Sequence, residues 1–212
     1  MGTVILLGLL NIHNLKITSI GVKTMIYYDK EKQKPVEEDK FKVDKNGDVI
    51  ITEGKFYCFD NSVIIAKGNS KVWAFDNSQV WAYENSEVVA HGKSEITASH
   101  NSKITASHNS RVWARGNSWV EAKDNSQVWA YENSRVWVYD KSEITASHNS
   151  KITASHNSKV TARGNSKVWA WENSKVEAKD NSEVWAHGKS KVSAWENSKV
   201  SAWDNSKVEA KQ

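Results

Sequence analysis

The chain has 212 residues, 39% of them hydrophobic, and a formal net charge of +4 from 29 basic and 25 acidic residues. These values are ordinary for a soluble protein of one or two domains, and the weak net charge predicts no specific nucleic-acid partner. A single cysteine excludes an internal disulfide framework. One proline beside eleven tryptophans is unusual, and such a bias is typical of a repetitive chain.

The N-terminal segment 4–10 is apolar, but no basic residue precedes it, Asn11 and His13 interrupt its continuation, and no small-residue cleavage site follows. It is also too short to cross a bilayer. We therefore expect neither a signal peptide nor a transmembrane segment, which leaves the localisation open between the cytoplasm and a surface-associated position. Residues 1–24 are interpreted as a capping or non-native, flexible extension, because Met25 offers an alternative start.

Residues 1–60 as a whole are interpreted as an N-terminal cap that ends in a degenerate first coil. The charged segment Lys30 to Lys45, which contains Pro35, is expected to be a loop, and segments 49–51 and 56–59 are expected to be strands. The thiol of Cys58 falls at an inward strand position and is predicted to belong to the core.

From residue 61 to residue 212 the sequence divides into 19 octads without an insertion, with the pattern Asn-Ser-x-Val-x-Ala-x-(Asp/Glu/Gly/His). Ser, Val and Ala alternate with polar and aromatic residues, and a period of two predicts a strand with one buried face. Ser78, Val80 and Ala82 exemplify the inward set. The Asp-Asn-Ser or Glu-Asn-Ser junction predicts a corner, because Asn and Asp tolerate turn geometry.

A strand that buries only Ser, Val and Ala cannot be stable alone, but stacked copies would form a continuous core. The sequence thus predicts an all-β, single-domain parallel β-solenoid over residues 61–212, right-handed by the general crossover preference. Glycine occupies the eighth position at intervals of three or six octads, and lysine replaces the leading Asn at every sixth octad. These intervals favour a three-sided coil built from three octads. The alternative is a two-sided coil built from two octads.

Repetition also argues against chemistry at a unique site. Four histidines, at positions 100, 108, 148 and 156, fall on corners that cannot converge on one metal ion, and each Ser or acidic residue occupies a recurring position. We expect no catalytic residues, no metal and no cofactor, so the protein is predicted not to be an enzyme. The recurrent Ser is expected to satisfy backbone groups, and the recurrent Asn to stack as an amide ladder.

Outward aromatic residues are the most distinctive feature of the octads. They are interpreted either as cross-strand packing or as a binding surface for a glycan or a partner protein. The candidate surface comprises Trp73, Phe75, Trp81, Tyr83, Trp129, Tyr131, Trp137, Tyr139, Trp169, Trp171, Trp195 and Trp203. Self-association through these faces is a further alternative that the sequence leaves open.

The C-terminal octad predicts a second surface. It has no cap comparable to residues 1–60, so its charged residues, Lys207, Glu209 and Lys211, are expected either to guard a sheet edge or to dock onto another copy. Outward Thr-x-Ser pairs, such as Thr97 and Ser99, resemble the faces of ice-binding proteins. Trp, Tyr, Glu and Lys interrupt the Thr rows, so ice binding is a minor hypothesis.

In architecture, the octads of residues 61–212 resemble the short-repeat β-solenoid proteins of bacteria and their phages. They lack the signatures of solenoid acyltransferases, calcium-binding repeats and ice nucleators, so no functional residue carries over. The resemblance implies a rigid rod that serves as a scaffold, spacer or binding surface. We therefore expect a structural scaffold or self-assembling element, or alternatively a carbohydrate-binding or adhesive module that uses the outward aromatic rows. A glycan-cleaving enzyme is the least favoured hypothesis.

Overall fold

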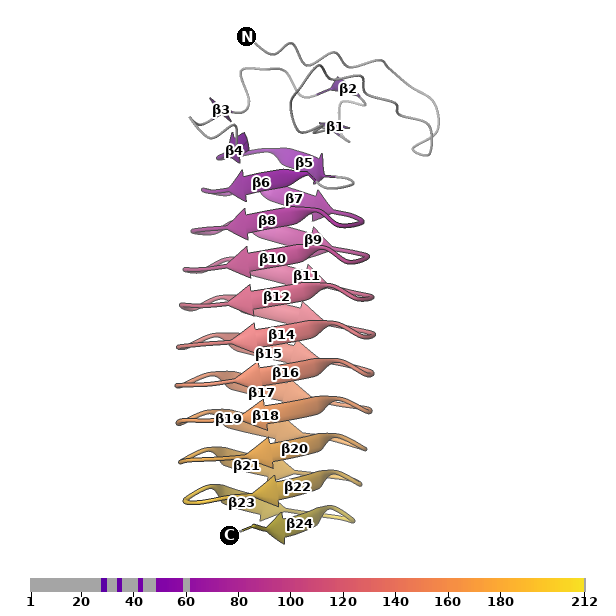
Figure 1. Cartoon of the computed structure of the whole chain (residues 1–212), viewed down its shortest axis with the longest axis vertical. Coiled ribbons are helices and arrows are strands. Elements are labelled where there is room, and N and C mark those ends of the chain that lie inside the picture. The colour runs from indigo at the N-terminus through magenta and orange to yellow at the C-terminus, as the bar shows by residue number, and fades with distance from the viewer. Residues whose placement is uncertain (1–27, 30–33, 36–41, 44–48, 59–61, 212) are drawn as a thin grey trace.

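The protein is a rod of stacked strands (Figure 1). The computed structural model describes residues 28–29, 34–35, 42–43, 49–58 and 62–211, and within these ranges every regular element is a strand. Two sheets, of twelve and ten strands, run along the rod, and a small antiparallel pair joins β1 (Tyr28–Asp29) to β2 (Lys34–Pro35). The predicted all-β parallel solenoid is confirmed.

Strands of the two sheets alternate along the chain. The twelve-stranded sheet contains β3 (Lys42–Val43), β4 (Val49–Ile51), β6 (Val63–Ala66), β8 (Gln79–Ala82), β10 (Glu95–Ala98), β12 (Arg111–Ala114), β14 (Gln127–Ala130), β16 (Glu143–Ala146), β18 (Lys159–Ala162), β20 (Lys175–Ala178), β22 (Lys191–Ala194) and β24 (Lys207–Ala210). The ten-stranded sheet contains β5 (Lys55–Cys58), β7 (Lys71–Ala74), β9 (Glu87–Ala90), β11 (Lys103–Ala106), β13 (Trp119–Ala122), β15 (Arg135–Val138), β17 (Lys151–Ala154), β19 (Lys167–Ala170), β21 (Glu183–Ala186) and β23 (Lys199–Ala202).

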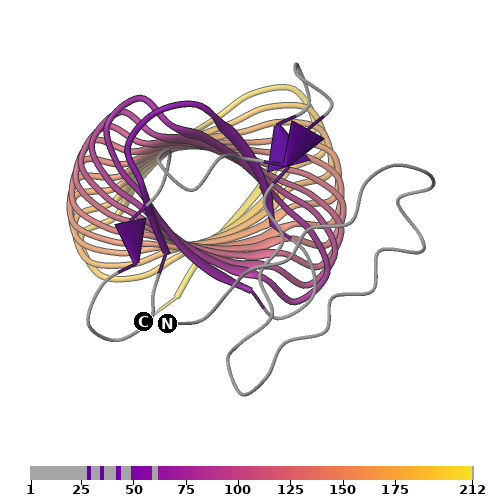
Figure 2. The same cartoon turned by 90° about the horizontal axis from the view of Figure 1, so that it is seen from above.

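The strand register fixes the size of the coil. Val112 pairs with Val128 in one sheet and Val120 pairs with Val136 in the other, so each residue lies beside its equivalent two octads further on. The favoured three-sided coil of three octads is therefore wrong, and the two-sided alternative is right. Seen from above, the coils enclose a flattened outline and turn progressively about the axis, as twisted sheets do (Figure 2).

Two observations explain why the spacing of the glycines and of the leading lysines predicted the wrong number of octads in a coil. Every described corner residue at the eighth position has positive φ. The angle lies between +55° and +61° for Asp, Glu and His, and the glycines have similar values, so glycine marks no special corner. In a two-sided coil, glycines that are three octads apart also fall alternately on the two rows of corners, so their spacing does not identify equivalent sites. Lys93, Lys141 and Lys189 are separated by six octads, which equals three coils of two octads as well as two coils of three.

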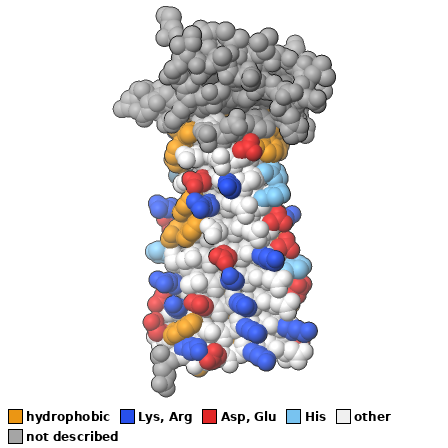
Figure 3. Space-filling view, turned by 45° about the vertical axis from the view of Figure 1, so that its right-hand side comes forward, with side chains coloured by type: hydrophobic (Ala, Val, Ile, Leu, Met, Phe, Trp, Pro, Cys, Tyr) orange, Lys and Arg blue, Asp and Glu red, His pale blue; other side chains and the backbone are white. Residues whose placement is uncertain are grey.

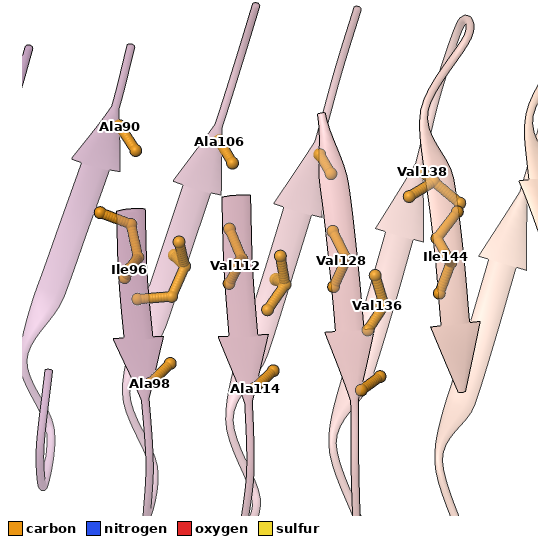
Figure 4. Packing of buried hydrophobic residues seen from close by; sticks show 14 of the residues in the cluster. Ala90, Ile96, Ala98, Ala106, Val112, Ala114, Val128, Val136, Val138 and Ile144 are labelled. Carbon is orange, nitrogen blue, oxygen red and sulfur yellow. The ribbon is translucent and has the colours of Figure 1, made fainter. Parts of the chain in front are cut away.

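Side-chain size gives the physical reason for two layers. Each strand contributes mainly one Val or Ile and one Ala to the interior, as at Ile96 and Ala98, and both are fully buried (Figure 4). Such short side chains fill the space between two facing sheets, whereas a triangular coil would leave a central void. Because close packing without voids is the norm in protein interiors, small inward residues favour the flattened coil.

The corners are held by hydrogen bonds that the octad encodes. Ser78 donates from both its backbone N–H, at 3.1 Å, and its hydroxyl, at 2.7 Å, to the carbonyl of Phe75, and most other octads repeat this arrangement. Most of the buried Ser hydroxyls therefore satisfy corner backbone groups, as predicted. In contrast, the expected Asn ladder is represented among the described residues by one weak contact, from Asn165 to Asn149 at 3.5 Å.

Glycine at the eighth position works together with an acidic residue one coil later. The Glu84 carboxylate accepts a hydrogen bond from the Gly68 N–H at 2.7 Å, and the Glu132 carboxylate accepts one from the Gly116 N–H at 2.8 Å. At Gly116 a β-carbon would lie 2.9 Å from the backbone nitrogen of His100. The carboxylate thus ties adjacent corners together, and the same bond forms at a corner without glycine, from the His108 N–H to Asp124 at 3.2 Å.

The first strands lie where the sequence predicts them, at β4 and β5, and Cys58 is fully buried in the core. Burial raises the pKa of the Cys58 thiol, despite hydrogen bonds with Ser62 and Ser78 that lower it. The expected loop from Lys30 to Lys45 is corrected in part, because backbone pairing places two-residue strands at β2 and β3. Most of the predicted cap, and Phe59, lie outside the described residues.

Candidate functional site

Outward side chains form straight rows along the rod. The third, fifth and seventh residues of an octad point away from the core, and each lies beside its equivalent two octads later. Adjacent members of a row are therefore separated by the strand spacing of about 4.8 Å. These rows present repeated outward side chains on the broad faces of the rod, so they are the candidate functional surfaces.

The predicted aromatic surface is divided between both broad faces of the rod. Trp81, Tyr83, Trp129, Tyr131 and Trp195 belong to the side of the twelve-stranded sheet, and Trp73, Phe75, Trp137, Tyr139, Trp169, Trp171 and Trp203 belong to the side of the ten-stranded sheet. These residues do not form one surface. On each face they occur in short groups separated by Thr, Ser, Glu and Lys.

Within these groups the rings stack face to face along the rod. Trp113 stacks on Trp129 with centroids 5.0 Å apart and planes 8° from parallel, and Trp169 stacks on Trp185 with nearly the same geometry. A longer stack contains Trp171, His187 and Trp203, with successive centroids 4.3 Å and 4.6 Å apart. Each of these contacts joins residues one coil apart.

This stacking bears on what the aromatic residues do. A ring that lies flat against the ring of the next coil has one face covered, so it presents mainly its edge to solvent. Trp119, Trp171 and Trp203 are the most accessible of the described tryptophans, at 43%, 42% and 46% exposure. The geometry therefore supports cross-strand packing as the main role of the aromatic rows, and it leaves few flat faces for a sugar ring.

Several residues that take part in these or other ring contacts were missed from the sequence: Tyr57, His91, Trp113, Trp119, Trp185 and His187. The sequence signal was available, since Trp113 and Trp129 occupy the same position in octads that are two apart. A three-sided coil would separate these residues, so it predicts only the pairs that lie within one strand.

Charged residues in the third-position rows are also matched between coils. Lys71 pairs with Glu87 at 2.7 Å, and Arg111 pairs with Glu95 at 3.3 Å. Side chains this exposed gain no more than about 1 kcal/mol from each pair. Of the candidate assembly residues, Lys207, Glu209 and Lys211 are all exposed at β24 or directly after it, and Lys211 pairs with Glu209. Their role in docking stays a prediction.

The four histidines considered from the sequence, His100, His108, His148 and His156, lie on the corners, as predicted. His108 approaches Asp124 at 4.0 Å and His156 approaches Glu172 at 3.7 Å. In the part of the chain that the structure describes, no group of three or more His, Cys, Asp or Glu is arranged to hold a metal ion. Nor do the described residues include a helix long and apolar enough to span a membrane.

No protein-family model, no curated protein and no solved structure matches this chain. The functional assignment therefore depends on the geometry of the rod and on the chemistry of its outward rows. The Thr rows do not support ice binding, because Thr97 lies between Trp81 and Trp113 in its own row. The arrangement offers stiffness along the axis and a few charged or aromatic patches.

One histidine is predicted to make stability depend on pH. Burial lowers the pKa of His91 from 6.5, and the charge of His108 lowers this pKa further. The ring stacks on Phe75 at 5.3 Å, and its Nδ1 lies 2.7 Å from the Ser107 hydroxyl. The unfolded chain thus binds this proton at a higher pH than the folded protein, so stability falls as pH drops below about 6.5.

Thermal melts between pH 5 and pH 8 check this expectation. In His91→Phe, which keeps a ring to stack on Phe75, the melting temperature should change less over this range than in the unaltered protein. The control His148→Asn alters an exposed corner histidine and should retain the contribution of His91. Equal pH dependence in the unaltered protein and His91→Phe would show that His91 is not the responsible group.

Proposed function

We propose that this protein is a non-enzymatic structural element, a rigid rod that acts as a scaffold or spacer and carries interaction surfaces on its faces. The single observation behind the proposal is the unbroken backbone ladder. From β6 to β24 and from β5 to β23, each strand hydrogen-bonds in parallel to the next strand of its sheet without a bulge or a change of register.

The ladder supports stiffness because bending the rod would stretch many hydrogen bonds at once. At about 4.8 Å for each step, the ten strands of one sheet extend over roughly 43 Å. The two sheets share a core in which each coil contacts only its neighbours, and such solenoids keep a fixed axial rise for each repeat. Ion pairs and ring stacks between coils, such as Lys71 with Glu87, reinforce the same axis.

The test measures whether length follows the number of coils. Cysteines introduced as Lys103→Cys and Lys199→Cys, in a Cys58→Ser background, lie at equivalent exposed positions six coils apart in the ten-stranded sheet. Spin labels on them should give one narrow distance distribution centred at roughly 29 Å, apart from the label linkers. Deletion of residues 149–164, which form one coil, should shorten this distance to roughly 24 Å.

Two results would contradict a rod-like scaffold. A broad distance distribution would show that the axis bends freely. A distance that does not change when one coil is removed would show that the two labelled positions are not separated by a regular stack. In either case the protein could not hold attached groups at a defined separation, and the proposed function would be lost.

A further inference from the structure

One row of the twelve-stranded sheet collects positive charge. Because β18, β20, β22 and β24 pair in register, their third-position residues follow one another along the rod: Lys159, Lys175, Lys191 and Lys207. We call this row the lysine column. Figure 3 shows lysine and arginine side chains aligned along the lower part of the molecule. Successive lysines are one strand spacing, about 4.8 Å, apart.

The lysine column differs from the matched charge pairs elsewhere in the third-position rows. Its first member, Lys159, is neutralised by Glu143 at 2.8 Å. For Lys175, Lys191 and Lys207, no carboxylate lies within ion-pair distance among the residues that the structure describes. Like charges held this close repel one another, so an anion bound along the column would be favoured by all of them.

The column forms most of one wall of an open groove of about 790 Å³ that extends from β14 to β24, and Gln127 and Glu143 continue this wall toward β14. The backbone of the inward residues Val160, Val176 and Val192 contributes to the lining between the third- and fifth-position rows. The opposite wall consists of fifth-position residues. Those that face the lysines carry hydroxyl or carboxylate groups, at Thr161, Glu177, Ser193 and Glu209, and the wall continues with Thr145 and Trp129. The groove thus has cations along one side and hydrogen-bonding oxygens along the other.

Charge is concentrated on this part of the face. The outward third, fifth and seventh positions of the octads containing β18, β20, β22 and β24 include seven basic and two acidic residues, a net charge of +5, whereas the whole chain carries +4. The weak overall charge therefore hides a local excess of positive charge on this part of the face, which favours the approach of an extended anion.

We propose that this groove binds a linear acidic polysaccharide, with its carboxylates along the lysine column and its hydroxyls toward Thr161, Glu177 and Ser193. In an extended chain, one sugar unit advances by close to one strand spacing, and neighbouring units are turned to opposite sides. Alternate carboxylates therefore face the column about two strand spacings apart and can meet every second lysine, such as Lys175 and Lys207. Carboxylate and hydroxyl side chains form hydrogen bonds with sugar hydroxyls. The groove ends at Trp129, which stacks on Trp113, and the proposed binding does not depend on the scaffold role.

The same geometry disfavours a nucleic acid. Phosphates of a duplex follow a helical path, so a straight row of lysines would meet few of them. Single-stranded sites combine a basic groove with aromatic platforms on which bases stack. Here the wall opposite the lysines carries no aromatic residue from Thr161 to Glu209, and Glu177 occupies a position that such a platform would need.

Calorimetric titration of the full chain with oligogalacturonate, a chain with one carboxylate on each sugar, tests the proposal. Binding should be saturable and should weaken as salt is added, since the contacts are exposed ion pairs. The fully methyl-esterified oligomer should not bind. Lys175→Gln combined with Lys191→Gln should weaken binding by roughly tenfold, because the chain loses a lysine contact whichever of the two alternate registers it adopts.

Two matched controls lie on the opposite sheet. Lys103→Gln with Lys199→Gln removes the same charge from exposed third positions beside Glu87 and Glu183, and should leave affinity unchanged. The second control is matched to a test variant in the groove itself. Ser193→Trp on β22 fills the groove without changing the charge and should abolish binding, whereas its control Ser201→Trp, at the same octad position on β23, should have no effect.

Several outcomes would overturn the assignment. Equal weakening by both lysine pairs would reveal attraction to net charge alone. Unchanged affinity in Ser193→Trp would place the ligand outside the groove. Tighter binding of a single-stranded or duplex oligonucleotide than of oligogalacturonate, with the same dependence on Lys175 and Lys191, would make the ligand a nucleic acid.

Discussion

Replacing Val128 by Asp is expected to destabilise the coils around β14 so strongly that the rod no longer unfolds in a cooperative transition. Val128 is 1% exposed and lies between Val112 and Ile144 in its sheet, with the opposite sheet across a thin core. A carboxylate there would have no polar partner and no route to water, at a cost of more than about 4 kcal/mol. Urea unfolding followed by far-UV circular dichroism measures the decrease in the free energy of unfolding and the loss of cooperativity.

The matched control changes the preceding residue of the same strand. Gln127 is outward and lies between Arg111 and Glu143, so an aspartate there meets one favourable and one unfavourable neighbour. Gln127→Asp should therefore alter the free energy of unfolding by no more than about 0.5 kcal/mol. If the two variants were equally stable, the inward and outward faces of β14 would have been assigned incorrectly.

Replacing Ala122 by Phe is expected to have the second-largest effect on stability. Ala122 is fully buried, and its neighbours in the sheet are Ala106 and Val138. The interior between the sheets is filled by Val, Ile and Ala, so a phenyl ring can enter only if the sheets separate. The free energy of unfolding should fall by about 3 kcal/mol or more.

The sequence itself supplies the control for this variant. Val138 occupies the same octad position one coil later, so the core accepts a valine there. Ala122→Val should cost about 1 kcal/mol, because two additional methyl groups require only a small adjustment. Denaturant titrations of both variants separate these cases, and a tolerated Phe would indicate a wider interior than the two facing sheets provide.

Both predictions follow from the different roles of the inward and outward positions of the octad. The inward positions vary little, because each coil must match the coils beside it, whereas the third, fifth and seventh positions vary freely. Interaction surfaces can therefore be placed at any height along the rod without disturbing its core. The lysine column and the aromatic stacks are two such surfaces on one framework.

Much of the fold was predictable from the octads. Alternation of small apolar and polar residues assigned Val80 and Ala82 to the core, and the Asn-Ser junction located the corners, both of which the structure confirms. The candidate binding residues were placed correctly on the outside. Their grouping was not, since which outward residues are neighbours depends on the number of octads in a coil.

The sequence by itself therefore determined what is local: strand, corner, inward face and outward face, because a period of two and the turn preference of Asn act within one octad. Only the tertiary structure decided which octads lie side by side. The three-octad spacing of glycines misled because every described corner adopts positive φ, whatever its residue. The two-sheet coil joins residues two octads apart, and that single interval creates the Trp113 and Trp129 stack and the lysine column.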